Sequence, residues 1–99
     1  MDITVNKAQG TIELIVKGRL DTTTAPQLET KVKEVSKEKV ILYMNLQGVE
    51  YISSAGLRVV LLAQKMMIAV GGKMILRSPS EFCRQVFEAT GMDAVLTIE

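Results

Sequence analysis

The sequence predicts an α/β fold, in which a small mixed β-sheet carries helices packed on one face. Apolar and polar residues alternate near the start of the chain, which is typical of paired strands. Later apolar segments of strand length alternate with segments of helical periodicity, giving the order β-β-α-β-α-β-α. Because strand-helix-strand crossovers join parallel strands, we expect the later strands to be parallel and the sheet to be mixed.

The first two elements are predicted to form a β-hairpin. Residues 3–7 and 11–17 each alternate apolar and polar side chains, and Ala-Gln-Gly at 8–10 is a turn signal between them. The tetrapeptide Gly-Arg-Leu-Asp at 18–21 then reads as a turn that caps the next helix. If the strands are parallel, however, Asp21 would lie at the same end of the sheet as Ser53 and Ser54, where ligand and partner sites are often found.

The first helix is predicted to begin at the hydroxyl-rich residues before Pro26, since proline is tolerated in a first helical turn. Ala25, Leu28, Val32 and Val35 recur at helical spacing and predict one stripe of contact with the sheet. This helix is expected to end at residues 36–38.

A nearly continuous apolar run at residues 40–46 predicts a strand buried on both faces or central in the sheet. Residues 47–50 are expected to form a loop. The most apolar helix of the chain is then expected at residues 57–70, with Gly71 and Gly72 as its exit. Residues 73–77 predict another buried strand.

The last helix is predicted from Ser-Pro-Ser-Glu at residues 78–81, a capping box with Ser78 as the cap and proline at the first helical position. Phe82, Val86 and Phe87 give this helix an apolar face, and Gly91 is expected to stop it. Residues 95–98 could close the chain as a short edge strand or a final turn.

The composition excludes several classes of function. The chain of 99 residues has a formal net charge of +1, 47% hydrophobic residues, one cysteine and no histidine. It is long enough for one core and too short for two. Without histidine and with a single cysteine, the chain cannot use histidine-dependent catalysis, form an internal disulfide or hold a Cys/His zinc site. Its net charge is too small to indicate nucleic-acid binding. We expect no cofactor, no metal and no enzymatic activity.

Targeting signals are also missing from the sequence. The first residues lack the charged and apolar regions of a signal peptide, and the apolar run at 59–70 is broken by polar residues and is too short to span a bilayer. We therefore expect a soluble, cytoplasmic protein that does not insert into a membrane, and nothing requires more than a monomer.

Two adjacent serines, Ser53 and Ser54, stand where the apolar helix is expected to begin. Serine is a preferred helix cap, which explains one hydroxyl without any further function. The alternative is that one hydroxyl accepts a phosphate, because a phosphate group is electrostatically favoured at a helix N-terminus. The two interpretations are compatible, since one serine can cap the helix while its neighbour faces solvent.

The apolar helix offers a second candidate feature. Most of its surface is expected to be core, but the side flanked by Ser54 and Arg58, with Val59, Leu62 and Met66 next to it, is the best candidate for an exposed partner patch. Gly56 in its first turn has two interpretations: tight packing against a neighbouring segment, or close approach of a partner.

The whole chain resembles a single-domain STAS protein (sulfate transporter and anti-sigma factor antagonist) of the bacterial anti-sigma factor antagonist family. The resemblance is carried by the opening hairpin, by the Gly-Arg-Leu-Asp element at 18–21, by the strand at 40–46 and by Tyr-Ile-Ser-Ser-Ala-Gly-Leu at 51–57. The last segment is similar to a family signature, commonly Asp-Ser-Ser/Thr-Gly-Leu/Ile. Ser53 stands where the family often has Asp, and Ala55 where it often has Ser or Thr, which leaves Ser53 as a competing phosphate acceptor.

The resemblance implies that Ser54 is phosphorylated by an anti-sigma factor that is a serine kinase. It also implies that the unphosphorylated form binds this kinase and releases a sigma factor, and that a serine phosphatase reverses the modification. The alternative within the same fold is a STAS subunit of a transport or other regulatory complex without a phosphorylation switch. From the residues and the resemblance together, the expected partner surface comprises Asp21, Ser53, Ser54, Ala55, Gly56, Arg58, Val59 and Leu62.

Overall fold

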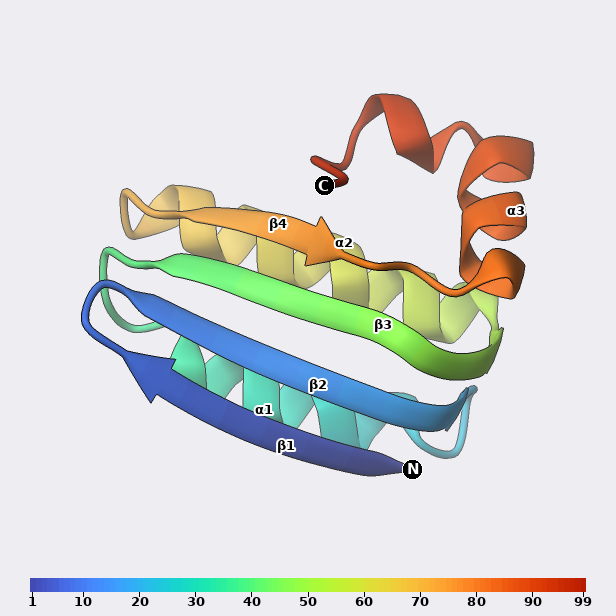
Figure 1. Ribbon diagram of the computed structural model, residues 1–99, viewed down its shortest axis with the longest axis horizontal. Coiled ribbons are helices and arrows are strands. Elements are labelled where there is room, and N and C mark those ends of the chain that lie inside the picture. Colours follow the sequence, from blue (N-terminus) through green and yellow to red (C-terminus); the bar gives the residue numbers. More distant parts are fainter.

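A computed structural model describes all residues of the chain, 1–99. Its sheet has four strands in the spatial order β1 (Asp2–Ala8), β2 (Thr11–Leu20), β3 (Ile41–Ile52) and β4 (Lys73–Arg77) (Figure 1). The hairpin pair β1–β2 is antiparallel, whereas β2–β3 and β3–β4 are parallel. The predicted mixed sheet is therefore confirmed.

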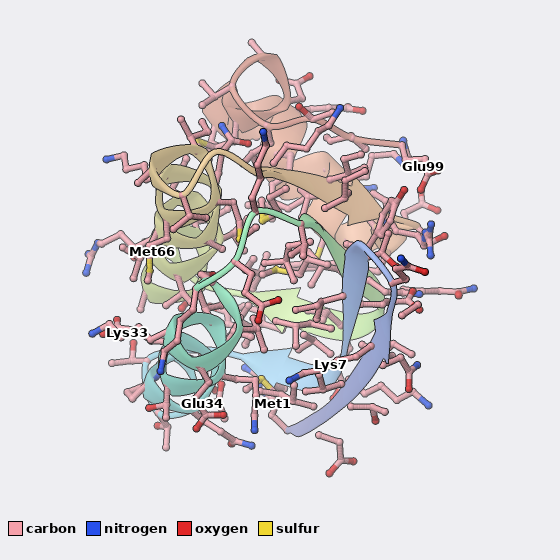
Figure 2. All side chains as sticks on the ribbon, turned by 90° about the vertical axis from the view of Figure 1, so that its left-hand side faces the viewer. Met1, Lys7, Lys33, Glu34, Met66 and Glu99 are labelled. Atoms are coloured by element: carbon pink, nitrogen blue, oxygen red, sulfur yellow. The ribbon has the colours of Figure 1, made fainter.

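The two longest helices, α1 (Ala25–Val35) and α2 (Ser54–Ala69), lie side by side on one face of the sheet (Figures 1 and 2). Side chains of these helices such as Lys33 and Met66 point away from the sheet (Figure 2). The third helix, α3 (Glu81–Thr90), lies beyond the end of β4 and is followed by the short 3-10 helix η1 (Met92–Ala94). The prediction that both long helices share one face is confirmed.

The core lies between the sheet and these helices. Alternate residues of the two central strands are buried, as period-two patterning requires for a sheet covered on one side. Because β1 is an edge strand, its apolar residues Ile3 and Val5 are only half-buried. The fully buried side chains come from both layers and include Leu14, Val16, Leu42, Met44 and Leu46 from the strands and Leu28, Val32, Val60, Met67 and Phe87 from the helices.

The predicted loop at residues 47–50 is wrong, because β3 continues to Ile52. Its second half pairs with the end of β2, which also makes Gly18, Arg19 and Leu20 strand residues and not a turn. The register between these strands shifts between Ile15 and Lys17 and again between Gly18 and Arg19, and Gly18 has a positive φ of 105°. The glycines and polar residues that suggested a loop therefore lie at bulges within β2 and β3. The two long strands stay paired to their last residues, so they end side by side.

The predicted cap of the last helix is also wrong. Ser80, and not Ser78, caps α3, because its Oγ accepts a hydrogen bond from the backbone N–H of Cys83 (3.2 Å). Ser78 instead has a positive φ of 50° and turns the chain out of β4. Glu81 is the first helical residue, so it cannot complete a capping box. The helix ends at Gly91 with φ 75°, as predicted.

The C-terminal residues add one bridge to the outer edge of β4. The backbone N–H of Leu76 donates to the Thr97 carbonyl and its carbonyl accepts from Glu99 N–H, both at 2.8 Å. The sequence left two alternatives for residues 95–98, a short edge strand or a final turn. The structure has a single parallel bridge between Leu76 and Ile98 at this edge. None of the helices combines the length and the apolar character that crossing a bilayer requires.

Candidate partner-binding site at the start of helix α2

The ends of β2 and β3 bring the candidate residues together. The backbone N–H of Ser53 donates a hydrogen bond to the carbonyl of Leu20 (2.9 Å), so Asp21 and the start of α2 lie next to each other. This is the carboxyl end of parallel strands, where polar groups from separate segments of a chain meet. The expectation that Asp21 shares an edge of the sheet with the two serines is confirmed.

The two serines have different environments. Ser53 is the cap of α2: its backbone is extended (φ −96°, ψ 175°) and its Oγ accepts a hydrogen bond from Gly56 N–H (3.4 Å). Ser54 is the first helical residue and is exposed, and its hydroxyl takes part in no hydrogen bond. The Ser53 hydroxyl is therefore engaged in capping the helix, whereas the Ser54 hydroxyl faces solvent. Phosphorylation of either serine stays a prediction.

Gly56 is buried, which corrects the expectation that it belongs to the partner surface. A Cβ at this position would lie 2.7 Å from Leu20 Cγ, 2.9 Å from the Leu20 carbonyl oxygen and 3.0 Å from Ile52 Cγ1. The glycine therefore lets the first turn of α2 pack directly on the ends of β2 and β3. Tight internal packing, the other of its two interpretations, is the one that the structure supports.

Asp21 is held rigidly by the threonines that follow it. Its Oδ1 accepts hydrogen bonds from the backbone N–H groups of Thr23 (3.0 Å) and Thr24 (3.1 Å), and its own N–H donates to Thr24 Oγ1 (2.9 Å). The hydrogen bond from Thr24 N–H is the main cause of a lowered pKa of the Asp21 carboxyl, and the nearby guanidinium of Arg19 (3.7 Å) also lowers it. Asp21 thus presents a fixed, ionised carboxylate beside the start of α2.

Three residues that the sequence analysis did not assign to the partner surface continue this edge. The Arg19 guanidinium carbon lies 4.3 Å from the centre of the Tyr51 ring, and the Tyr51 and Phe82 ring centres are 5.4 Å apart at an angle of 44°. We call Arg19, Tyr51 and Phe82 the aromatic row. The sequence could have indicated only Arg19 and Tyr51, which lie near the ends of neighbouring strands. Phe82 belongs to α3, far along the chain, and could not be placed beside them without the structure.

A groove of about 450 Å³ runs between α1 and α2. Its α2 wall includes Ala55, Arg58, Val59 and Leu62, all of which the sequence analysis placed on the partner surface. Ala55 and Leu62 are half-buried and Arg58 is exposed, whereas Val59 is only 5% exposed. The expectation that Val59 is part of an exposed patch is therefore wrong, because this residue is buried where α2 packs beside α1 along the groove.

Comparison with known proteins identifies the family. Residues 2–99 match the sequence profile described as the STAS domain, and the chain belongs to this family. BtrV of Bordetella bronchiseptica, provisionally named an anti-sigma factor antagonist, is 33% identical over 99 residues, which cover 99% of this chain and 85% of BtrV. The anti-sigma-B factor antagonist of Bacillus subtilis is 28% identical, with 99% of this chain and 90% of that protein covered.

Solved structures share the fold at lower identity. An anti-sigma factor antagonist from Mycobacterium paratuberculosis superimposes with a TM-score of 0.87 at 23% identity, covering 98% of this chain and 83% of that one. Unphosphorylated SpoIIAA, also an anti-sigma factor antagonist, gives a TM-score of 0.81 at 22% identity, covering 99% and 88%. These structures confirm the STAS fold of the four-stranded sheet and its helices.

Proposed function

We propose that this STAS protein is an anti-sigma factor antagonist whose Ser54 is phosphorylated by an anti-sigma factor serine kinase. One observation carries the assignment of the residue: Ser53 Oγ is occupied by the helix cap, and the exposed hydroxyl of Ser54 lies next to it at the start of α2. In this proposal the unphosphorylated protein binds the kinase and releases a sigma factor. A serine phosphatase restores the binding form, and the chain itself catalyses nothing.

The geometry supports a switch that acts through charge. Phosphate adds about −1.5 to −2 charge at neutral pH, and the fold tolerates it because Ser54 is exposed and sits at a helix N-terminus. A partner that covers the start of α2 would have to bury this charge. An uncompensated buried charge costs several kcal/mol, and each 1.4 kcal/mol weakens affinity about tenfold. Phosphorylation would therefore release the partner without unfolding the domain.

Relatives support the proposal in two ways. The sequence relatives named above are described as anti-sigma factor antagonists, and they match nearly the whole of this chain. SpoIIAA of Bacillus, which shares the fold, has also been solved in a phosphorylated form, with a TM-score of 0.75 to this chain at 22% identity. A STAS fold of this kind therefore accommodates phosphorylation.

The experiment that tests the proposal locates the phosphate. The protein is incubated with ATP and a candidate anti-sigma factor serine kinase from the same organism, and the modified residue is identified by mass spectrometry. We expect phosphate on Ser54 in the wild-type protein, none in Ser54→Ala, and retention of Ser54 phosphate in the matched variant Ser53→Ala. Phosphate on Ser53, or on neither serine with a kinase of proven activity, would overturn the assignment.

A binding measurement tests the switch itself. Ser54→Asp places a negative charge at the proposed site and should weaken kinase binding at least tenfold, while Ser54→Ala should bind as wild type does. If Ser54→Asp binds as tightly as the wild-type protein, the charge mechanism is wrong. That result would favour the alternative of a STAS subunit that contacts its complex without a phosphorylation switch.

A further inference from the structure

Arg58 is an exposed arginine one helical turn after Ser54. Residues four apart on a helix are neighbours on its surface, and helical Cα–Cβ bonds tilt toward the N-terminus, so Arg58 shares one face of α2 with Ser54 and is tilted toward it. A negative group at the first position and a positive group four residues later is the favourable order for such a pair. The spacing and the direction of this helix therefore place a guanidinium within reach of a group on Ser54.

Arg58 has no anionic partner in the unmodified protein. It takes part in none of the five ion pairs of the chain and stacks on no aromatic ring. Glu29, the carboxylate that lines the same groove from α1, is paired with Lys33 at 3.0 Å. The first turn of α2 contains no acidic residue. An anion added at Ser54 would thus meet a cation that is not engaged elsewhere.

We propose that Arg58 binds the phosphate of phosphorylated Ser54, so that the modification forms an ion pair within the first turns of α2. This inference rests on the proposed function, because it concerns the same phosphate. A guanidinium can donate two parallel hydrogen bonds to a phosphate, whereas an ammonium acts as a point charge. The chemistry at position 58 therefore decides how firmly the phosphate is held.

The pair would change the partner surface in two ways at once. Phosphorylation places a dianion at Ser54, and it also engages the positive charge of Arg58 at the edge of the groove. A partner carboxylate that docks against Arg58 would then lose its counter-charge. Affinity is accordingly expected to fall through a lost attraction as well as through a new repulsion.

The phosphate can be installed without any kinase, by incorporating phosphoserine at position 54 of the full chain during translation. Phosphorus NMR then gives the second pKa of the phosphate, which is about 6 in free phosphoserine. The charged groups on the segments next to Ser54 are Arg58 on α2, Glu29 on α1 and Asp21 with Arg19 at the strand ends. We expect this pKa to be lower in the wild-type background than in Arg58→Gln, with Arg58→Lys in between.

The matched control is Lys65→Gln, which removes an equal charge from the same groove two turns further along α2. It should leave the phosphate pKa close to the wild-type value. Equal pKa values in the wild-type and Arg58→Gln proteins would overturn the ion pair. An increase in Lys65→Gln as large as in Arg58→Gln would also overturn it, because net charge alone would then explain the effect. Neither result depends on whether a kinase modifies Ser54, so failure of the proposed function is recognised separately.

Discussion

Gly56 at the start of α2 packs directly against Leu20 at the end of β2. A Cβ on residue 56 would lie 2.7 Å from Leu20 Cγ and 2.9 Å from its carbonyl oxygen, both closer than real Cβ contacts allow. The same Leu20 carbonyl accepts the hydrogen bond from Ser53 N–H (2.9 Å). One strand end therefore positions both the cap and the first turn of the helix that carries Ser54.

This contact predicts that Gly56→Ala destabilises the protein despite the higher helix propensity of alanine. Propensity favours alanine by about 1 kcal/mol, but overpacking a closed contact costs typically about 1–3 kcal/mol and here involves a backbone oxygen that cannot rotate away. Urea denaturation should show a net loss of stability. Leu20→Ala should reduce the cost of the substitution, because it removes the nearer of the two atoms. A Gly56→Ala protein as stable as the wild type would contradict the packing described above.

The different roles of the two serines predict different stabilities for their alanine variants. Ser53→Ala removes the cap acceptor for Gly56 N–H and should cost about 0.5–2 kcal/mol of unfolding free energy. Ser54→Ala removes an exposed hydroxyl without a hydrogen-bond partner and should change stability by less than about 0.5 kcal/mol. Denaturant titration of both variants under one buffer condition measures the difference. Equal losses in the two variants would mean that both hydroxyls support the helix start.

Asp21 predicts a pH dependence of stability at the acid end. Because hydrogen bonds from Thr24 and Thr23 lower the pKa of its carboxyl in the folded protein, the ionised form stabilises the fold above the pKa of the unfolded chain. This contribution is lost as the pH falls below about 4 toward the lower folded value. The unfolding free energy of Asp21→Asn should therefore fall less steeply over that range than that of the wild type. Parallel curves for the two proteins would show that Asp21 is not the group responsible.

Periodicity was sufficient to predict the element order, the mixed sheet and the shared face of the two long helices. Each rests on many residues in a repeating pattern, so no single misassigned position changes the result. Ser53 as the cap could also be predicted, because capping depends on residue type and on a helix start a few residues away.

The errors have a common physical origin. The polar and glycine residues at 47–50 are compatible with a loop, and only pairing with β2 makes them strand. Ser78 and Ser80 are equally good caps by type, and Ser80 is the one whose backbone N–H donates a hydrogen bond to the carbonyl of Leu46 on β3 (3.2 Å). The burial of Gly56 and Val59 depends on how α2 meets its neighbours. In each case contacts with residues distant in sequence decide the outcome.

The aromatic row gives the last prediction, which concerns the extent of the partner surface. Phe82 is 38% exposed and packs against Tyr51, whose ring also contacts Arg19. Aromatic and arginine side chains are enriched in protein interfaces. If the proposed kinase covers the start of α2, Phe82→Ala should weaken its binding about tenfold, or about 1.4 kcal/mol. Ile68→Ala is the matched control: Ile68 is 62% exposed but lies near the opposite end of α2, so binding should not change. Calorimetric titration of both variants measures the difference, and unfolding curves verify that each is folded. Equal affinity of Phe82→Ala and the wild type would restrict the partner surface to Asp21, Ser54 and the groove between the helices.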